Sequence, residues 1–177
     1  MKGLLFICLN SGILLSSCNE VPAPQESVSQ SMETNNAQIK RQFITANQQL
    51  MQKENDEMDY YATSHKMAFV RTGSGIRYYV YETSAQGDSI KNDMVISMDY
   101  SVSLLDGTLC YSSEREGRRT FKVGQEEIES GIHKGVQYLK RGDKALIMIP
   151  SPLAHGLLGD FKKIPPQMPI VYDVIIY

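Results

Sequence analysis

Residues 94–111 read MVISMDYSVSLLDGTLCY, and this stretch decides the fold class. Two strand-like runs, Met94–Leu105 and Leu109–Tyr111, flank the dipeptide Asp106-Gly107. An Asp-Gly pair between two such runs is typical of the tight turn of a β-hairpin. The stretch therefore predicts two antiparallel strands joined at Asp106-Gly107.

Further strand-like runs lie on both sides of this hairpin. They are Ile76–Glu82, Thr120–Val123, Lys144–Ile149 and Ile170–Tyr177. One helical pattern interrupts them, with apolar residues at intervals of four, four and three: Ile128, Ile132, Val136 and Leu139. Gly142 follows where a glycine commonly caps a helix. An antiparallel β-sheet wrapped over one short helix is an α+β fold, which we expect for residues 73–177.

A second helical pattern precedes this domain. Residues 37–69 contain no proline or glycine, and a stripe recurs at a spacing of about 3.6 between charged residues. The stripe consists of Ile39, Phe43, Ala46, Leu50, Met58, Tyr61 and His65. It predicts an amphipathic helical segment within residues 37–72, with a break near Asn55. This segment either packs on its own domain or forms a homodimerisation arm through residues 37–69.

The N-terminus has the pattern of an export signal. A short basic start precedes a mostly apolar run, Leu4–Leu15, which is too short for the roughly 20 residues of a membrane span but fits a signal-peptide core. The sequence Leu15-Ser16-Ser17-Cys18 resembles the lipobox of bacterial lipoproteins. The resemblance implies that residues 1–17 are removed and that Cys18 is acylated. The alternative is an ordinary secretory signal followed by a chance cysteine.

The lipobox predicts where the protein is located, and the segment that follows it is expected to be a tether. Acylated Cys18 predicts a membrane anchor in the cell envelope, at the outer membrane and facing the periplasm. Residues 18–36 are rich in Pro, Ser, Gln, Glu and Asn, so we expect a disordered tether. With Cys8 lost with the signal and Cys18 acylated, Cys110 has no intramolecular disulfide partner.

Charge and metal-ligand patterns point away from several classes of function. The formal net charge is −2, with no basic excess of the kind that binds nucleic acid. The histidines His65, His133 and His155 show no metal-ligand spacing among themselves or with a cysteine. We therefore expect no metal, no cofactor and no nucleic-acid partner.

The segment Val95–Tyr177 resembles an FK506-binding-protein domain. The matching residues are Tyr100, Asp106-Gly107, Ser112-Ser113, Phe121-Lys122-Val123-Gly124, Gly131, Gly135-Val136, Gly142, Ala145, Ile149, Ala154, Gly156, Ile164-Pro165-Pro166 and Val171-Tyr172-Asp173-Val174. The resemblance implies a peptidyl-prolyl cis-trans isomerase acting on X-Pro segments of exported proteins. With the lipobox and the run Arg71–Tyr78, the chain also resembles the gliding-motility-associated lipoprotein isomerases of Bacteroidetes.

The resemblance assigns the walls of a proline-binding pocket. The matching wall positions are Tyr100, Ile128, Ile164 and Tyr172, and Phe121 matches a nearby aromatic. The backbone N–H that holds a substrate carbonyl falls at Glu129, where the side chain is expected to matter less. Taken singly, each wall residue is more typical of core packing than of ligand contact.

Four pocket positions depart from the family pattern. Cys110 stands where phenylalanine is usual, Tyr111 replaces an aspartate, and Ile132 replaces the tryptophan of the pocket floor. His155 replaces a tyrosine whose hydroxyl bonds the substrate; taken alone, it is more typical of a solvated loop. These departures imply an isomerase of low specific activity. The alternative is a non-catalytic proline-peptide binding module or holdase chaperone.

Overall fold

The computed structural model describes residues 26–125 and 128–177 and divides the chain into two compact units, one ending at Gln42 and one spanning Phe43–Tyr177. The expected signal peptide, Cys18 and residues 18–25 of the expected tether lie outside the described residues. In the described residues, no helix is both long enough and apolar enough to cross a bilayer.

The helix α1 begins earlier than expected and runs without a break from Glu26 to Ser64. Residues 26–36, expected to be disordered, are therefore helical. No proline or glycine occurs between Pro24 and Gly73, so nothing in the chain interrupts the helix even where its residues are polar. The expected break near Asn55 is absent, since α1 runs through it, and the carbonyl oxygen and side chain of Asn55 accept hydrogen bonds from Arg77.

The helix ends before Phe69, where the pattern had placed its end. The backbone N–H of Met67 bonds the carbonyl of Ala62, and Lys66 adopts a left-handed φ of 55°. This geometry is typical of a helix C-terminus. The chain then enters the sheet at Val70, so the end of the expected helical segment belongs to the sheet instead.

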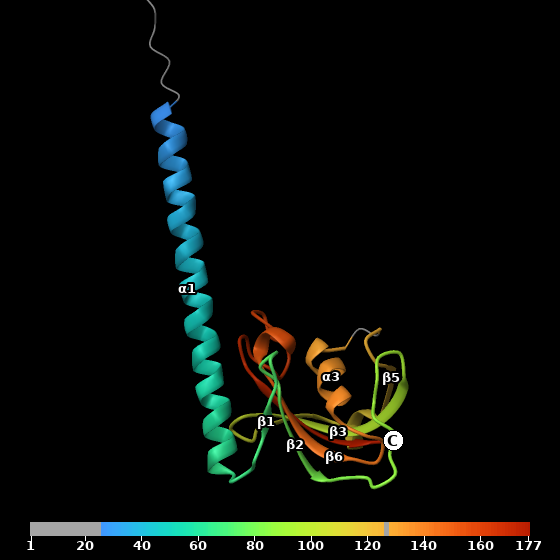
Figure 1. Cartoon of the computed structure of the whole chain (residues 1–177). Coiled ribbons are helices and arrows are strands. Elements are labelled where there is room, and N and C mark those ends of the chain that lie inside the picture. Colours follow the sequence, from blue (N-terminus) through green and yellow to red (C-terminus); the bar gives the residue numbers. More distant parts are fainter. Residues whose placement is uncertain (1–25, 126–127) are drawn as a thin grey trace, which may run out of the picture. The chain divides into compact units, whose positions relative to one another are not determined.

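The sheet is antiparallel throughout, with seven strands among the described residues in the order β1-β2-β6-β7-β3-β4, and with β5 also paired to β3. The strands are β1 Val70–Arg71, β2 Arg77–Glu82, β3 Val95–Leu104, β4 Leu109–Ser112, β5 Arg119–Lys122, β6 Lys144–Ile149 and β7 Ile170–Ile176. The short helices are α2 Ser113–Glu116 and α3 Ser130–Gly135, with 3-10 turns η1 Val136–Tyr138 and η2 Ser151–Leu153. The α+β prediction is confirmed (Figure 1).

The hairpin prediction at Asp106-Gly107 is also confirmed. Gly107 has a φ of 87°, and its N–H donates to the carbonyl of Leu104. The carboxylate of Asp106 accepts the N–H of Thr108 at 2.8 Å. A short polar side chain and a residue free to adopt positive φ are what such a turn requires.

The helix α3 is shorter than its stripe and packs against β6. Ile132, Val136 and Leu139 are buried as expected, whereas Ile128 precedes the helix. The approach to the sheet is close, because a Cβ at Gly131 would lie 2.2 Å from Ile149 Cγ2. Only glycine allows this contact.

Gly142 does not cap α3, contrary to expectation. The helix continues as η1 and ends at Tyr138, and Leu139 leaves it in an extended conformation. Gly142 instead lies in the turn that enters β6, with a φ of 87° and its N–H bonded to the carbonyl of Ile176. The glycine serves a turn into the sheet, where positive φ is required.

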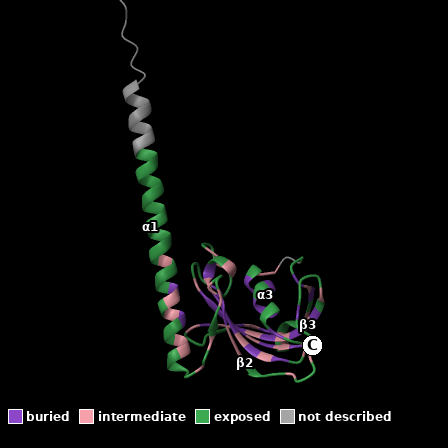
Figure 2. Ribbon diagram, in the orientation of Figure 1, coloured by how far each residue is buried: buried purple, intermediate pink, exposed green. Residues whose placement is uncertain are grey.

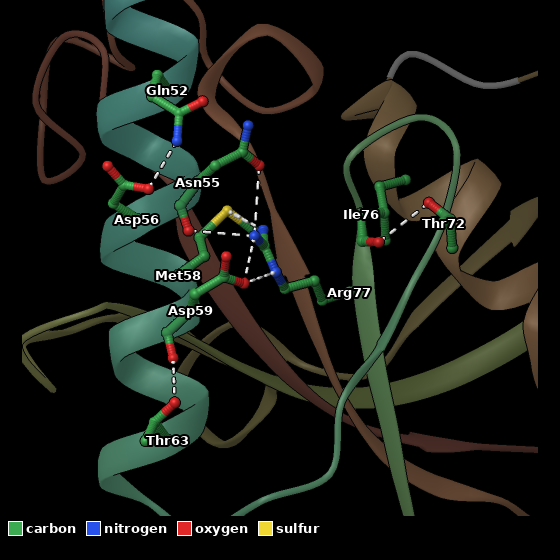
Figure 3. A network of polar contacts seen from close by, with 9 residues as sticks. All are labelled: Gln52, Asn55, Asp56, Met58, Asp59, Thr63, Thr72, Ile76 and Arg77. Atoms are coloured by element: carbon green, nitrogen blue, oxygen red, sulfur yellow. Dashed lines mark hydrogen bonds and ion pairs between the residues drawn. The ribbon is translucent and has the colours of Figure 1, made fainter.

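The last turns of α1 pack on the opposite face of the sheet. Met58 is fully buried in a second core with Met148 and Val171, and Figure 2 shows buried and half-buried residues only along the lower part of α1. Arg77, only 1% exposed, donates from Nη2 to Asp59 Oδ1 at 2.6 Å and from Nη1 to Met58 Sδ at 3.1 Å (Figure 3). The C-terminal part of the helix therefore packs on its own domain.

We expect Met58→Ala to lower the free energy of unfolding by about 2–4 kcal/mol, because it leaves a cavity between α1 and the sheet. Urea unfolding followed by circular dichroism measures this. The matched control is Met51→Ala on the same helix, where the side chain is 53% exposed and the cost should stay within about 0.5 kcal/mol. Equal costs for the two variants would contradict the packing described above.

Candidate functional site

A cavity of about 280 Å³ opens on the α3 side of the sheet. Strands β3, β4, β5 and β7, the end of α2, the N-cap of α3 and the loop after η2 contribute to its wall. The lining residues are Tyr100, Val102, Tyr111, Glu116, Arg119, Glu129, His155, Asp160, Lys162 and Tyr172. A neighbouring hollow of about 450 Å³ shares Arg119, Glu129 and His155 and adds Ile128, Ser130 and Ala154.

Two tyrosines form the aromatic part of the wall. Tyr100 on β3 and Tyr172 on β7 lie with ring centroids 6.2 Å apart and planes tilted by 43°. Burial raises the pKa of Tyr172 well above its ordinary value, and the nearby Glu129 carboxylate adds to the effect. Burial also raises the pKa of Tyr100, whose hydroxyl donates to Glu116 Oε2 at 2.8 Å. Both phenols therefore stay neutral at physiological pH.

A cluster of charged side chains forms the other part of the wall. The Glu129 carboxylate lies 3.6 Å from Arg119 Nη1 and 3.2 Å from His155 Nε2. Its side chain is only 12% exposed. Arg119 also lies over the Tyr100 ring, with Cζ 5.0 Å from the ring centroid, a cation–π geometry. Burial alone would lower the pKa of Arg119, but the oxygens of Tyr172 and Glu129 raise it overall.

Asp160 builds the loop at the mouth of the cavity. Its Oδ1 accepts the backbone N–H groups of Lys162, Lys163 and Ile164 at 2.8–2.9 Å, and its Oδ2 accepts the Tyr111 hydroxyl. Burial alone would raise the pKa of Asp160, but these hydrogen bonds lower it overall. The hydrogen bond between the Tyr111 hydroxyl and Asp160 raises the pKa of Tyr111 to about 12. The carboxylate thus ties the loop to β4.

The structure brings together only part of the predicted site. Lining the cavity are Tyr100, Tyr111, Glu129, His155 and Tyr172, and Ile128 lines the neighbouring hollow. In the core behind them lie Cys110, Phe121, Ile132 and Ile164, each at most 3% exposed. His155 is not a solvated loop residue, since its side chain is 22% exposed and faces Glu129.

Sequence reasoning missed five lining residues and one side-chain role. The residues are Val102, Glu116, Arg119, Asp160 and Lys162. The Glu129 carboxylate, expected to matter less, stands at the centre of the charged cluster. Gly159-Asp160 is a recognisable turn signal. The alternating charges of residues 114–119 carried no comparable signal.

Comparison with known families assigns the domain that contains this cavity. The family model of the FKBP-type peptidyl-prolyl cis-trans isomerases matches residues 87–177, just over half of the chain. The chain belongs to this family. The match covers every residue that lines the cavity, so the FKBP-type domain contains the whole candidate site.

Curated relatives agree with this assignment, and a solved structure agrees with the fold. The chain is 33% identical over 123 residues to the probable FKBP-type peptidyl-prolyl cis-trans isomerase FkpA of Neisseria meningitidis, covering 69% of this chain and 44% of that protein. It is 30% identical to the macrophage infectivity potentiator of Trypanosoma cruzi, over 59% of this chain and 53% of that protein. The crystal structure of FkpA from Escherichia coli matches with a TM-score of 0.59 at 23% identity, over 88% of this chain and 72% of that one. The chain thus spans about half the length of these curated relatives.

Proposed function

We propose that the cavity catalyses cis-trans isomerisation of X-Pro bonds in exported proteins. The observation that carries the proposal is an aromatic cavity, walled by Tyr100 and Tyr172, within an FKBP-type domain. Rotation about the X-Pro bond has a barrier near 20 kcal/mol, because it breaks amide resonance. A cavity that removes the amide from water favours the twisted, less polar state.

The polar groups of the site suit a carbonyl of the bound chain. Among the described residues the backbone N–H of Glu129 makes no hydrogen bond, and Glu129 is the N-cap of α3 beside the cavity. An N–H in this position offers a donor to a substrate carbonyl. The reaction then needs no nucleophile, since no covalent bond is made or broken.

A binding module or holdase is the second candidate, and the charged cluster favours it. Arg119, Glu129 and His155 give part of the wall a polar, ionic character. Such a wall keeps polar groups next to the reacting amide and weakens the effect of desolvation. A proline-limited refolding assay separates the two candidates: acceleration supports the isomerase, whereas binding of the same chain without acceleration supports the module.

We expect Tyr172→Ala to lower kcat/KM for an X-Pro peptide by at least about tenfold, since it removes an aromatic wall of the cavity. Tyr172→Phe should keep most of the rate, because the ring and not the hydroxyl fills the wall. The control is Tyr138→Ala, which removes a 47% exposed tyrosine outside the cavity. Folding of each variant is checked first by circular dichroism. Unchanged turnover in Tyr172→Ala would exclude the cavity as the active site.

We propose that Cys18 carries a lipid that anchors the protein in the cell envelope, at the outer membrane. The support is the lipobox-like sequence Leu15-Ser16-Ser17-Cys18. The lipobox-like sequence and the run Arg71–Tyr78 also support membership of the gliding-motility-associated lipoproteins. Cys18→Ala should move the protein from the membrane to the soluble fraction, and intact mass should show an acylated N-terminal cysteine in the parent chain. Unchanged fractionation would exclude the anchor.

We propose that the exposed stretch of α1 forms a homodimer contact. Ile39, Phe43 and Ile44 are 42–66% exposed, whereas Met58 is buried in its own domain and so takes no part. On the Cys18→Ala background the chain should sediment as a dimer. The paired substitutions Ile39→Glu and Phe43→Glu should give a monomer with unchanged stability of the domain. A monomer before substitution would exclude the contact.

A further inference from the structure

Glu54 is a buried carboxylate in the interior of α1. Its residue is 2% exposed, and it accepts the backbone N–H of Ser151 at 2.9 Å as well as the Ser151 hydroxyl. Among the described residues these are its hydrogen-bond partners, and no cation pairs with it. Burying an unpaired carboxylate costs free energy even when it is hydrogen-bonded. The Glu54 carboxylate therefore serves to fix Ser151 rather than to stabilise α1.

Ser151 in turn holds the loop that carries His155. The Ser151 carbonyl accepts the N–H of Ala154 at 3.1 Å and that of Gly156 at 2.7 Å, on either side of His155. Ala154 and His155 line the hollow beside Glu129. One residue on α1 is thus connected, through a single serine, to the wall of the candidate active site.

The helix supplies a fixed point for this connection. Met58 lies four residues after Glu54, on the same face, and is buried under the sheet. Asp59 accepts two hydrogen bonds from Arg77 on β2, at 2.6 and 2.9 Å (Figure 3). These contacts prevent α1 from rotating on the sheet, so the Glu54 carboxylate has a set position.

We propose that Glu54 is a positioning residue of the isomerase site: it fixes the loop 151–156 and thereby places His155 and Ala154 for binding of the X-Pro segment. This inference rests on the proposed function for its kinetic consequence. Its structural part, restraint of the loop from α1, stands independently of catalysis.

The test compares Glu54→Gln with Glu57→Gln in the full chain. Glutamine keeps the size of Glu54 but presents one acceptor oxygen where two were used, so one donor of Ser151 loses its partner. Glu57 is a matched control, because it lies one turn further along α1, has a side chain 43% exposed and pairs with Lys53. Amide hydrogen exchange at Ala154 and Gly156 should accelerate by about tenfold in Glu54→Gln and stay unchanged in Glu57→Gln.

The kinetic readout separates positioning from a loss of folded protein. A displaced wall weakens binding of the ground and transition states alike, so KM should rise several-fold at nearly constant kcat. Partial unfolding would instead lower the apparent kcat at constant KM. Ser151→Ala, which keeps the backbone N–H bond to Glu54, should shift KM and amide exchange in the same direction but less.

The outcomes distinguish this inference from the proposed function. A parent chain without isomerase activity overturns the proposed function, and amide exchange then decides whether Glu54 restrains the loop. An active parent chain whose Glu54→Gln variant keeps both its KM and its loop exchange overturns the positioning role. If Glu54→Gln fails to fold, Ser151→Ala decides by the same two measurements.

Discussion

Strands β6 and β7 supply side chains to both hydrophobic cores, and everything else in the domain is arranged around their register. Ile147 pairs with Tyr172, and the next pair along is Met148 with Val171. Successive side chains point to opposite faces, so the first pair joins the core under α3 and the second joins the core under α1. A slip of one residue would exchange the two sets. The cavity and the docking of α1 therefore depend on a single register.

The fold was more predictable than its boundaries. The Asp106-Gly107 turn follows from local chemistry, because a tight hairpin turn depends on its own backbone angles. The start of α1 did not follow from polarity, since the polar residues 26–36 are part of the helix. Gly142 shows the same limit: a glycine after an apolar stripe fits either a helix cap or a turn into a strand. Only the contact with Ile176 on β7 decides between the two.

The site was predictable only in its aromatic half. Tyr100 and Tyr172 lie within strands whose pattern is evident, so their placement follows from the sheet. The charged half joins Arg119 on β5, Glu129 before α3 and His155 after η2, which are distant in sequence. No periodicity relates such residues. Their contact follows from the tertiary fold alone.

The two halves of the site have opposite physical consequences. In the proposed isomerisation the tyrosine rings displace water and favour a twisted amide, whereas the carboxylate and guanidinium retain a strong local field. Arg119 partly reconciles them, because its guanidinium lies over the Tyr100 ring and also approaches Glu129. The Arg119 guanidinium and the Glu129 carboxylate offset much of each other's charge. What a bound chain meets is then a wall of mixed polarity rather than the dry aromatic pocket that the sequence resemblance implied.

The exposure of the apolar side chains on α1 changes at Glu54, which lies between an exposed stretch and a stretch packed on the sheet. Before that residue, Phe43, Ile44 and Met51 are exposed, and after it Met58 is buried against the sheet. A continuous helix is stiff, because each backbone N–H is bonded to the carbonyl four residues earlier. A load applied to the exposed stretch within Phe43–Met51 is therefore carried to Glu54 rather than absorbed in between. Since Glu54 bonds Ser151, such a load reaches the loop bearing His155.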